Sequence, residues 1–169
     1  MQDDVISTVI AGIGGQGVLK ASDILSEAAF TSGYDVKKSE LHGMSQRGGS
    51  VSSDVRFGDN VLSPMVPIGE ADYLVVLRED QVEVNRHRLA DDGELITTDA
   101  IDVESLPNKK SLNVALLGVL STYLDIPEGS WLEAIKANLP TKFHEANEQA
   151  FSMGRQAGRI SVSESGGQP

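Results

Sequence analysis

The amino-acid sequence predicts a single α/β domain: an open, mostly parallel sheet with helices on both faces, which gives three α/β/α layers. Its 169 residues suit one domain of ordinary size. A short β-branched run, a glycine cluster and a helix-compatible segment open the chain in that order. Further strand-like runs follow, and helical periodicity dominates the last third of the chain. Strands that alternate with helices in this way are typical of an open α/β sheet.

The first predicted strand leads directly into a glycine-rich turn. Residues 5–11 are mostly apolar and β-branched, and a helix is expected over about residues 18–31. Between them, the spacing Gly-x-Gly-x-x-Gly fits the turn that binds the pyrophosphate of a dinucleotide, where a helix N-terminus offers free N–H groups to an anion. The candidate cofactor-binding residues of this turn are Gly12, Gly14, Gly15, Gln16 and Gly17.

The next predicted strand, residues 34–37, bears on the identity of that anion. In a nicotinamide-binding domain, an acidic residue near the end of this strand holds the ribose hydroxyls. Here the strand ends in Lys37 and Lys38, which we expect to be solvated. The sequence therefore argues against a nicotinamide cofactor. The glycine turn by itself is still compatible with the binding of a dinucleotide.

A second candidate loop covers residues 39–50 and has neither helical nor strand periodicity. It contains Gln46 and His42, and a histidine can titrate near neutral pH. Arg47 is followed by two glycines, so its guanidinium stands beside backbone that can approach a phosphate or a carboxylate closely. The alternative is that this segment is only a well-packed connection. Because both loops follow strands, and ligands in open α/β sheets bind at the carboxyl ends of strands, we expect the two loops to face one crevice.

The remaining elements follow from periodicity and turn residues. Residues 51–57 alternate apolar and polar side chains, as in a strand with one polar face, and 71–77 and 94–98 suit central strands. Two prolines make 61–68 an edge strand or an extended loop. Helices are expected over residues 80–90, 112–124, 130–139 and 142–159, and capping boxes open the first and third of them. A flexible tail is expected over residues 160–169.

The composition excludes several classes of function. The chain has no cysteine, so it carries no disulfide, thiolate nucleophile or cysteine-bound zinc or iron–sulfur cluster. Its three histidines lack the spacing of a metal site, so no metal is expected. A net charge of −11 argues against a nucleic-acid partner. Neither a signal peptide nor a membrane-spanning segment is predicted, which favours a cytoplasmic protein.

The two loops also resemble a known family. Gly-Ile-Gly-Gly-Gln-Gly at residues 12–17 is similar to the opening of the gamma domain of 2-oxoacid:ferredoxin oxidoreductases. The block Ser-Glu-Leu-His-Gly-Met-Ser-Gln-Arg-Gly-Gly-Ser-Val at residues 39–51 is similar to the signature of the beta subunit of the indolepyruvate-type enzymes. The resemblance extends over residues 5–158, so residues 1–159 are assigned to one gamma-type domain. Members of this subunit type are usually somewhat longer than this chain.

The resemblance implies a Rossmann-like subunit of a multisubunit enzyme that oxidatively decarboxylates aryl 2-oxoacids, such as indolepyruvate, to acyl-CoA while it reduces ferredoxin. In this family a larger alpha subunit carries thiamine diphosphate and the iron–sulfur clusters, and coenzyme A (CoA) is a co-substrate. The isolated chain is then expected to be inactive and able to form a homodimer. The open alternatives are a gamma subunit of a pyruvate- or ketoisovalerate-type oxidoreductase, and a non-catalytic dinucleotide-binding or scaffold protein.

The resemblance also suggests roles for the loop residues, since the sequence shows no self-sufficient catalytic constellation. The glycine turn and Arg47 are expected to hold an anionic group at the subunit interface, either the CoA phosphates or the 2-oxoacid carboxylate. His42 and Gln46 are expected to line the entrance or to contact the partner's active site. His42 and Arg47 are the catalytic candidates, and Gln46 and Arg47 join the glycine turn as cofactor-binding candidates.

Overall fold

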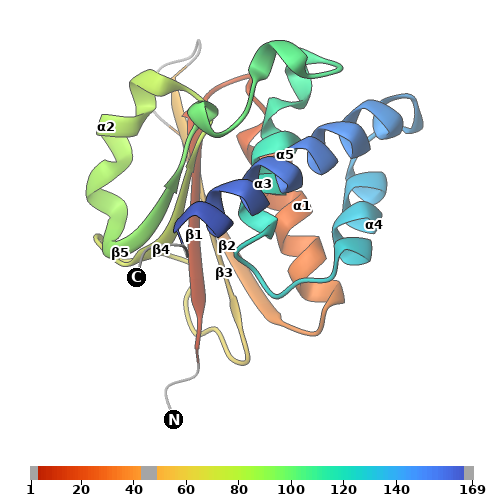
Figure 1. Cartoon of the computed structure of the whole chain (residues 1–169). Helices are drawn as coiled ribbons and strands as arrows, with labels where there is room; N and C mark the ends of the chain where they lie inside the picture. Colours follow the sequence, from red (N-terminus) through yellow and green to blue (C-terminus); the bar gives the residue numbers. More distant parts are fainter. Residues whose placement is uncertain (1–3, 43–48, 166–169) are drawn as a thin grey trace.

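Five strands form one open sheet in the order β2-β3-β1-β4-β5 (Figure 1). The computed structural model describes residues 4–42 and 49–165. The strands are β1 (Ile6–Ile13), β2 (Asp35–His42), β3 (Ser50–Gly58), β4 (Ala71–Val76) and β5 (Leu89–Ile96). Strands β1, β4 and β5 pair in parallel, whereas β3 pairs antiparallel with both β1 and β2. Four of these five strands therefore run in one direction, which confirms the prediction of an open, mostly parallel sheet.

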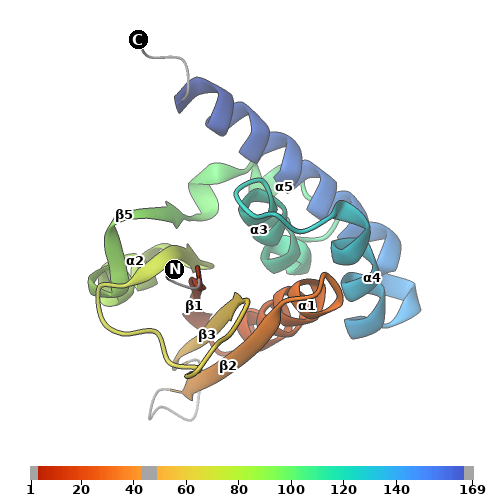
Figure 2. The ribbon, with the colours of Figure 1, turned by 90° about the horizontal axis from the view of Figure 1, so that it is seen from below.

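Helices cover both faces of this sheet, but unequally. They are α1 (Val18–Thr31), α2 (Val82–Asn85), α3 (Leu112–Ser121), α4 (Glu128–Asn138) and α5 (His144–Ser165). The connections β1–α1–β2 and β4–α2–β5 leave the middle of the sheet in opposite directions, so right-handed crossovers put α1 and α2 on opposite faces. In Figure 2, α1 and α3 lie beside the sheet with α4 and α5 outside them, and α2 lies on the other side. The three predicted layers are present, and the α2 layer is thin.

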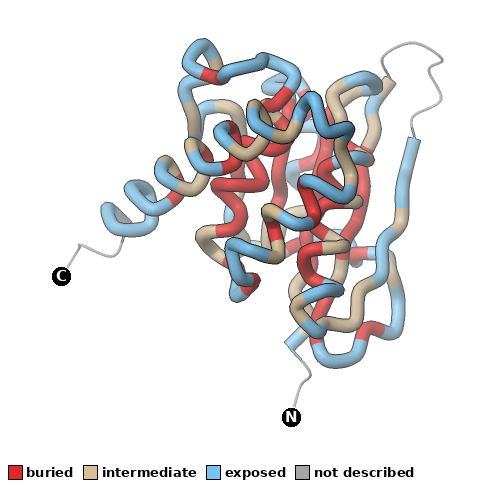
Figure 3. The backbone as a smooth tube through the Cα atoms, turned by 90° about the vertical axis from the view of Figure 1, so that its right-hand side faces the viewer, coloured by how far each residue is buried: buried red, intermediate tan, exposed pale blue. Residues whose placement is uncertain are grey.

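The core on the α1 side holds most of the buried apolar side chains. Ile10, Val55 and Val75 of the sheet pack there against residues of α1, α3 and α4. Nine of the ten residues of α3 are buried, as predicted for a helix that is apolar around most of its girth. Figure 3 shows buried segments inside a shell of exposed turns. On the α2 side, a smaller cluster joins Val9 and Leu74 to Val66, so the extended 61–70 connection covers part of that face.

The helix predicted over residues 80–90 is wrong in length. Only α2 is α-helical there, and single 3₁₀ turns flank it at Glu79–Gln81 and Arg86–Arg88. No side chain caps either start, so the predicted capping box does not form. Asn85 donates its side-chain amide to the Gln81 carbonyl at 2.8 Å, and such local side-chain bonds compete with continued helix.

The two edge strands are longer than the sequence predicts. β2 extends to His42, so residues 39–42 are strand and not loop. β5 begins at Leu89 and lies at an edge of the sheet, whereas a central strand was expected over residues 94–98. The Asp-Asp-Gly sequence at 91–93, which was expected to separate a helix from that strand, falls in an irregular part of the β4–β5 pairing, where the register shifts.

The C-terminal helices also have different ends from those predicted. α4 begins at Glu128 after the N-cap Pro127, so the capping box expected from Ser130 does not start it. α5 continues through Ser165, and residues 160–165, which were assigned to a flexible tail, are helical. Neither proline nor glycine occurs between Ile160 and Ser165, so no residue there is a strong helix breaker. Residues 166–169 lie outside the described ones.

The polar face predicted for β3 is buried. Nη2 of Arg88 donates to both carboxylate oxygens of Asp54, at 2.7 and 2.8 Å, and Nη1 donates to Ser52 Oγ at 3.3 Å. The backbone N–H of Val66 donates to the same carboxylate at 2.9 Å. This ion pair, whose two side chains are 15% and 8% exposed, fastens the 61–70 connection and the start of β5 to the sheet.

Substitution Arg88→Met is expected to lower the free energy of unfolding by about 3 kcal/mol, because it leaves the Asp54 carboxylate buried without its counter-charge. Arg86→Met is the matched control, since Arg86 pairs with Glu83 at a largely exposed site and should contribute less than about 1 kcal/mol. Urea denaturation of both variants checks this difference. Equal losses of stability would show that the burial of the Arg88 pair has no energetic consequence.

Candidate functional site

The glycine turn lies at the carboxyl end of β1, where the strand order of the sheet reverses. The chain leaves β1 toward β2 on one side and leaves β4 toward β5 on the other, and open α/β sheets bind ligands at such a switch point. The side-chain amide of Gln16 accepts from the N–H of Ile13 at 3.0 Å and donates to the carbonyl of Leu77 at 3.2 Å. Gln16 therefore ties the end of β1 to the residue that follows β4.

Two glycines of the turn have backbone conformations that favour glycine. Gly15 has φ 87° and Gly17 has φ 80°, both in the left-handed region. A Cβ at Gly17 would also lie 2.5 Å from Nδ2 of Asn113, which donates to the Gly17 carbonyl at 3.1 Å. A Cβ at Gly15 would meet no atom within 4 Å. Gly17 is thus required for packing against α3, whereas Gly15 borders open space.

The N-terminus of α1 is arranged to receive an anion. No side chain caps it, and its first turn contains no acidic residue. Its N–H groups and the positive end of the helix dipole are therefore available to a negative ligand. A pocket of about 540 Å³ opens beside this turn, and it is lined by Ile13, Gly14, Gly15, Gly17, Val18, Leu19, Lys20, His42 and Val51.

The two predicted loops meet at this pocket. The N–H of Gly14 donates to the carbonyl of Gly49 at 3.0 Å, and His42 at the end of β2 lines the same pocket. This confirms that the two segments face one crevice. Gln46 and Arg47 lie outside the described residues, so their contacts remain predictions. In the sequence they stand between His42 and Gly49, both of which belong to the rim just described.

A lysine and a histidine line the pocket, and both side chains can bind a phosphate or a carboxylate. His42 has a side chain that is 58% exposed, and its Nε2 lies 4.0 Å from a carboxylate oxygen of Glu40. Lys20 adds a cation in the first turn of α1. Neither Lys20 nor the supporting contact of Asn113 was among the predicted site residues. Lys20 could have been found, because the third residue of a helix that follows a glycine turn lies beside any anion bound there.

Lys37 and Lys38 of β2 are exposed, as the sequence predicts, and each also interacts with neighbouring groups. Lys37 donates to the carbonyl of Val61 and lies 3.6 Å from the carboxylate of Asp35. Lys38 forms ion pairs with Asp23 of α1 and with Glu40. Burial lowers the pKa of the Lys38 ammonium, but the two carboxylates outweigh burial and raise that pKa above its usual value. Neither lysine lines the glycine-turn pocket.

Substitution Gln16→Ala is expected to lower the free energy of unfolding by about 1–3 kcal/mol, since the Ile13 N–H and the Leu77 carbonyl lose their partner. Gln16→Glu keeps the acceptor for Ile13 but places a carboxylate oxygen against the Leu77 carbonyl, so it should not restore the stability of the wild type. Urea denaturation measures both. An unchanged midpoint for Gln16→Ala would show that the amide does not stabilise the turn and would leave ligand binding as its role.

The described residues offer neither a metal site nor a membrane span. In residues 4–42 and 49–165, no group of three or more histidine, aspartate or glutamate side chains is placed to hold a metal ion. Within the same ranges, no helix combines the length and the apolar character that crossing a bilayer requires. Beside the glycine turn, the described residues offer an anion backbone N–H groups, Lys20 and His42.

The fold and the pocket together define an open α/β domain with an anion-binding glycine turn at the sheet's switch point. Residues 7–110 match the family model for pyruvate ferredoxin/flavodoxin oxidoreductase. The chain is 34% identical over 193 residues to the indolepyruvate oxidoreductase subunit IorB of Thermococcus kodakarensis, with 89% of this chain and 95% of that protein covered. It is 30% identical over 162 residues to the pyruvate synthase subunit PorC of Methanothermobacter thermautotrophicus, with 84% and 89% covered.

A solved structure has the same fold. The gamma subunit of the keto/oxoacid ferredoxin oxidoreductase from Geobacter sulfurreducens superposes with a TM-score of 0.72 at 22% identity, covering 92% of this chain and 99% of that one. The chain belongs to the pyruvate ferredoxin/flavodoxin oxidoreductase family. The alignment with the Thermococcus subunit is longer than the whole of this chain, so that relative carries segments that this chain lacks.

Proposed function

We propose that this chain is the small subunit of an indolepyruvate-type 2-oxoacid:ferredoxin oxidoreductase. With a larger subunit it would oxidatively decarboxylate an aryl 2-oxoacid to the acyl-CoA and pass the electrons to ferredoxin. The observation that carries the proposal is the 34% identity to a subunit named for indolepyruvate over nearly the whole chain. The 39–51 block supports it, because that block contains His42 and Val51, which line the glycine-turn pocket.

The redox and thiamine chemistry is assigned to the larger subunit. Without a cysteine, this chain has no thiolate with which to bind an iron–sulfur cluster in the usual way. Thiamine diphosphate supplies the carbanion stabilisation that decarboxylation of a 2-oxoacid needs. The small subunit then contributes binding and orientation, and alone it would not turn over substrate.

The glycine-turn pocket is the part of this chain that would meet the reactants. Its uncapped α1 N-terminus and Lys20 suit the phosphates of CoA or the carboxylate of the 2-oxoacid. Arg47 would add a planar pair of donors to either group, and His42 and Gln46 would line the entrance. A charge-assisted hydrogen bond contributes about 1.5–3 kcal/mol, enough to change the kinetics of either reactant more than tenfold.

Substitution Arg47→Ala tests this role in the complex of both subunits. We expect kcat/KM for CoA or for the 2-oxoacid to fall by roughly 10- to 100-fold, and the reactant that is affected identifies the bound anion. Arg47→Lys keeps the charge but loses the paired donors, so its kcat/KM should lie between those of the wild type and of Arg47→Ala. If Arg47→Ala leaves the kinetics of both reactants unchanged, the pocket does not bind a reacting group through this side chain.

The same assay decides the substrate class. Indolepyruvate and other aryl 2-oxoacids should be oxidised with a higher kcat/KM than pyruvate. The similarity to a pyruvate synthase subunit makes pyruvate the relevant competitor. A preference for pyruvate would overturn the indolepyruvate assignment while leaving the role of the small subunit intact.

A further inference from the structure

The two edges of the sheet differ in how they are protected from pairing with another chain. On the β5 edge, the pairing with β4 is irregular, and residues 91–94 carry three carboxylates and a glycine. Bulges and like charges of this kind discourage an edge strand from pairing. β2 at the other edge is eight residues long, pairs with β3 in unbroken register, and contains neither proline nor glycine. Among the described residues, no strand pairs with its outer edge.

The outer edge of β2 is exposed and has a distinct charge pattern. Five of its eight residues are exposed, among them the apolar Leu41 at 68%. Figure 3 shows exposed strand leading to the grey segment at the upper right. Lys38 and Glu40 lie two residues apart and therefore point to the same face of the sheet. This edge thus offers unpaired backbone, and on one face it carries Lys38 and Glu40, which form an ion pair with each other.

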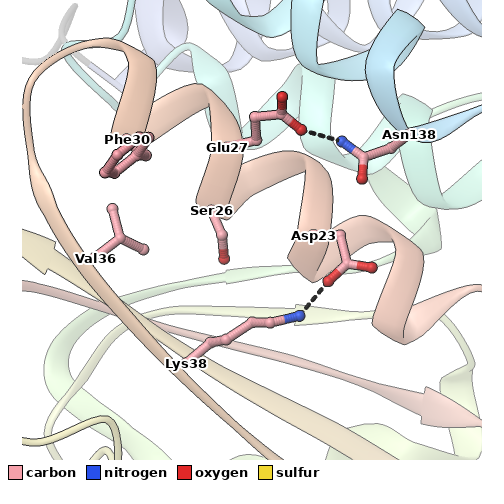
Figure 4. A pocket seen from close by; sticks show the side chains of 7 residues that line it. All are labelled: Asp23, Ser26, Glu27, Phe30, Val36, Lys38 and Asn138. Carbon is pink, nitrogen blue, oxygen red and sulfur yellow. Dashed lines mark hydrogen bonds and ion pairs between the residues drawn. The ribbon is translucent and has the colours of Figure 1, made fainter.

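The inner face of β2 is fixed against α1, so the strand is held in an extended form. Figure 4 shows Lys38 reaching from β2 to the carboxylate of Asp23 on α1, with Phe30 and Val36 facing each other farther along. An open, shallow pocket of about 450 Å³ is lined by these two elements and by Asn138 of α4. Phe30 at its border is 69% exposed. A strand that is already ordered loses little conformational freedom when it pairs with a partner.

We propose that β2 pairs antiparallel with β2 of a second copy of this chain, so that two five-stranded sheets join into one of ten strands. The two-fold axis is perpendicular to the sheet and passes midway between Ser39 of one copy and Ser39 of the other. Lys38 of each copy then lies opposite Glu40 of the other, and Leu41 lies opposite the aliphatic stem of Lys37. This inference does not depend on the proposed enzymatic function.

The charges favour this register over the two symmetric registers nearest to it. Such an axis keeps the faces of the two sheets aligned, so only residues that point to the same face can lie opposite each other. Moving the axis to Lys38 would put two lysines opposite each other, and moving it to Glu40 would put two glutamates opposite each other, both unfavourable. With the axis at Ser39, the four charges alternate in sign along and across the strands. The sequence of β2 is thus complementary to its own antiparallel copy.

The occupant of this edge is a second copy because the charge pattern is self-complementary and because only backbone pairing is needed. The interface of two eight-residue strands is small, so a weak dimer that dissociates on dilution is expected. The chain's net charge of −11 makes two copies repel each other, so low salt should weaken the dimer.

Sedimentation velocity of the full-length chain over a wide range of concentration tests the proposal. The wild-type protein should change from monomer to dimer as its concentration rises. Glu40→Lys places two lysines opposite each other at two equivalent positions, and it should raise the dissociation constant by about tenfold or more. Asp92→Lys makes the same charge change on the β5 edge and should leave the dimer intact. A chain that stays monomeric, or equal effects of both variants, would overturn the proposal.

A mixing experiment separates pairing from folding. Lys38→Glu and Glu40→Lys should each be mainly monomeric, because each places like charges opposite one another. When the two variants are mixed, every opposed pair is again of opposite sign, so a heterodimer should form. A mixture of the two folded variants that remains monomeric contradicts the register. If Lys38→Glu does not fold, the comparison of Glu40→Lys with Asp92→Lys decides alone.

Discussion

A carboxylate introduced at residue 15 is expected to remove most of the activity of the assembled enzyme without unfolding the subunit. Gly15 lines the glycine-turn pocket, and a Cβ there would meet no atom within 4 Å. In Gly15→Asp, a negative side chain stands beside the uncapped N-terminus of α1, where the reacting anion is proposed to bind. We expect kcat/KM for that anion to fall by roughly 10- to 100-fold. Steady-state kinetics of the reconstituted complex measures the loss.

Gly15→Asn is the matched control for this substitution. Asn and Asp have nearly the same size, and both tolerate the positive φ of residue 15 better than other side chains do. Both variants should lose about 1–2 kcal/mol of stability through the backbone. The helix dipole stabilises a carboxylate, so the Asp variant should be at least as stable as the Asn variant. If Asn lowers kcat/KM as much as Asp does, the site is not selective for an anion.

The largest effect on stability is expected from the contact between α3 and α5. In Gly154→Val, the new Cβ would overlap the carbonyl oxygen of Ala115, and Gly118 lies against the same part of α5. Backbone that is packed this closely cannot make room by turning a side chain, so the two helices have to separate. We expect a loss of at least about 3 kcal/mol in the free energy of unfolding, measured by urea denaturation.

Gly129→Ala is expected to raise the free energy of unfolding in the same assay. Gly129 lies in α4, and its Cβ would meet no atom within 4 Å, so alanine should stabilise the protein by about 0.5–1 kcal/mol. If Gly154→Val lowered the free energy of unfolding no more than Gly129→Ala does, α3 and α5 would not be packed as closely as described.

Local sequence patterns predicted the elements whose signals were strong. The glycine turn, α1 and the buried α3 follow directly from glycine spacing and from apolar periodicity, and the structure confirms them. The ends of β2 and β5 could not be predicted, because strand pairing fixes them. Residues 39–42 are mostly polar and become strand only because β3 provides their hydrogen-bonding partner.

Only part of the candidate site could be predicted, because local sequence patterns do not show contacts between residues that are distant in the sequence. The sequence identified both loops, and it correctly brought them to one crevice through the rule that ligands bind at the carboxyl ends of strands. It could not show that the Gln16 amide is bonded to Ile13 and Leu77, because Leu77 is distant in the sequence. Asn113 was likewise not expected beneath the glycine turn, since only the packing of α3 places it there.

Reconstitution with the larger subunit tests the central claim most directly. An affinity tag on this chain should retrieve a larger, cysteine-rich, thiamine-dependent subunit from the same cells. The purified complex should reduce ferredoxin when indolepyruvate and CoA are supplied, and neither subunit should do so alone. If this chain instead purifies as a stable monomer with a bound NAD(P) or flavin, and adding the larger subunit changes no activity, then it is not a subunit of such an oxidoreductase.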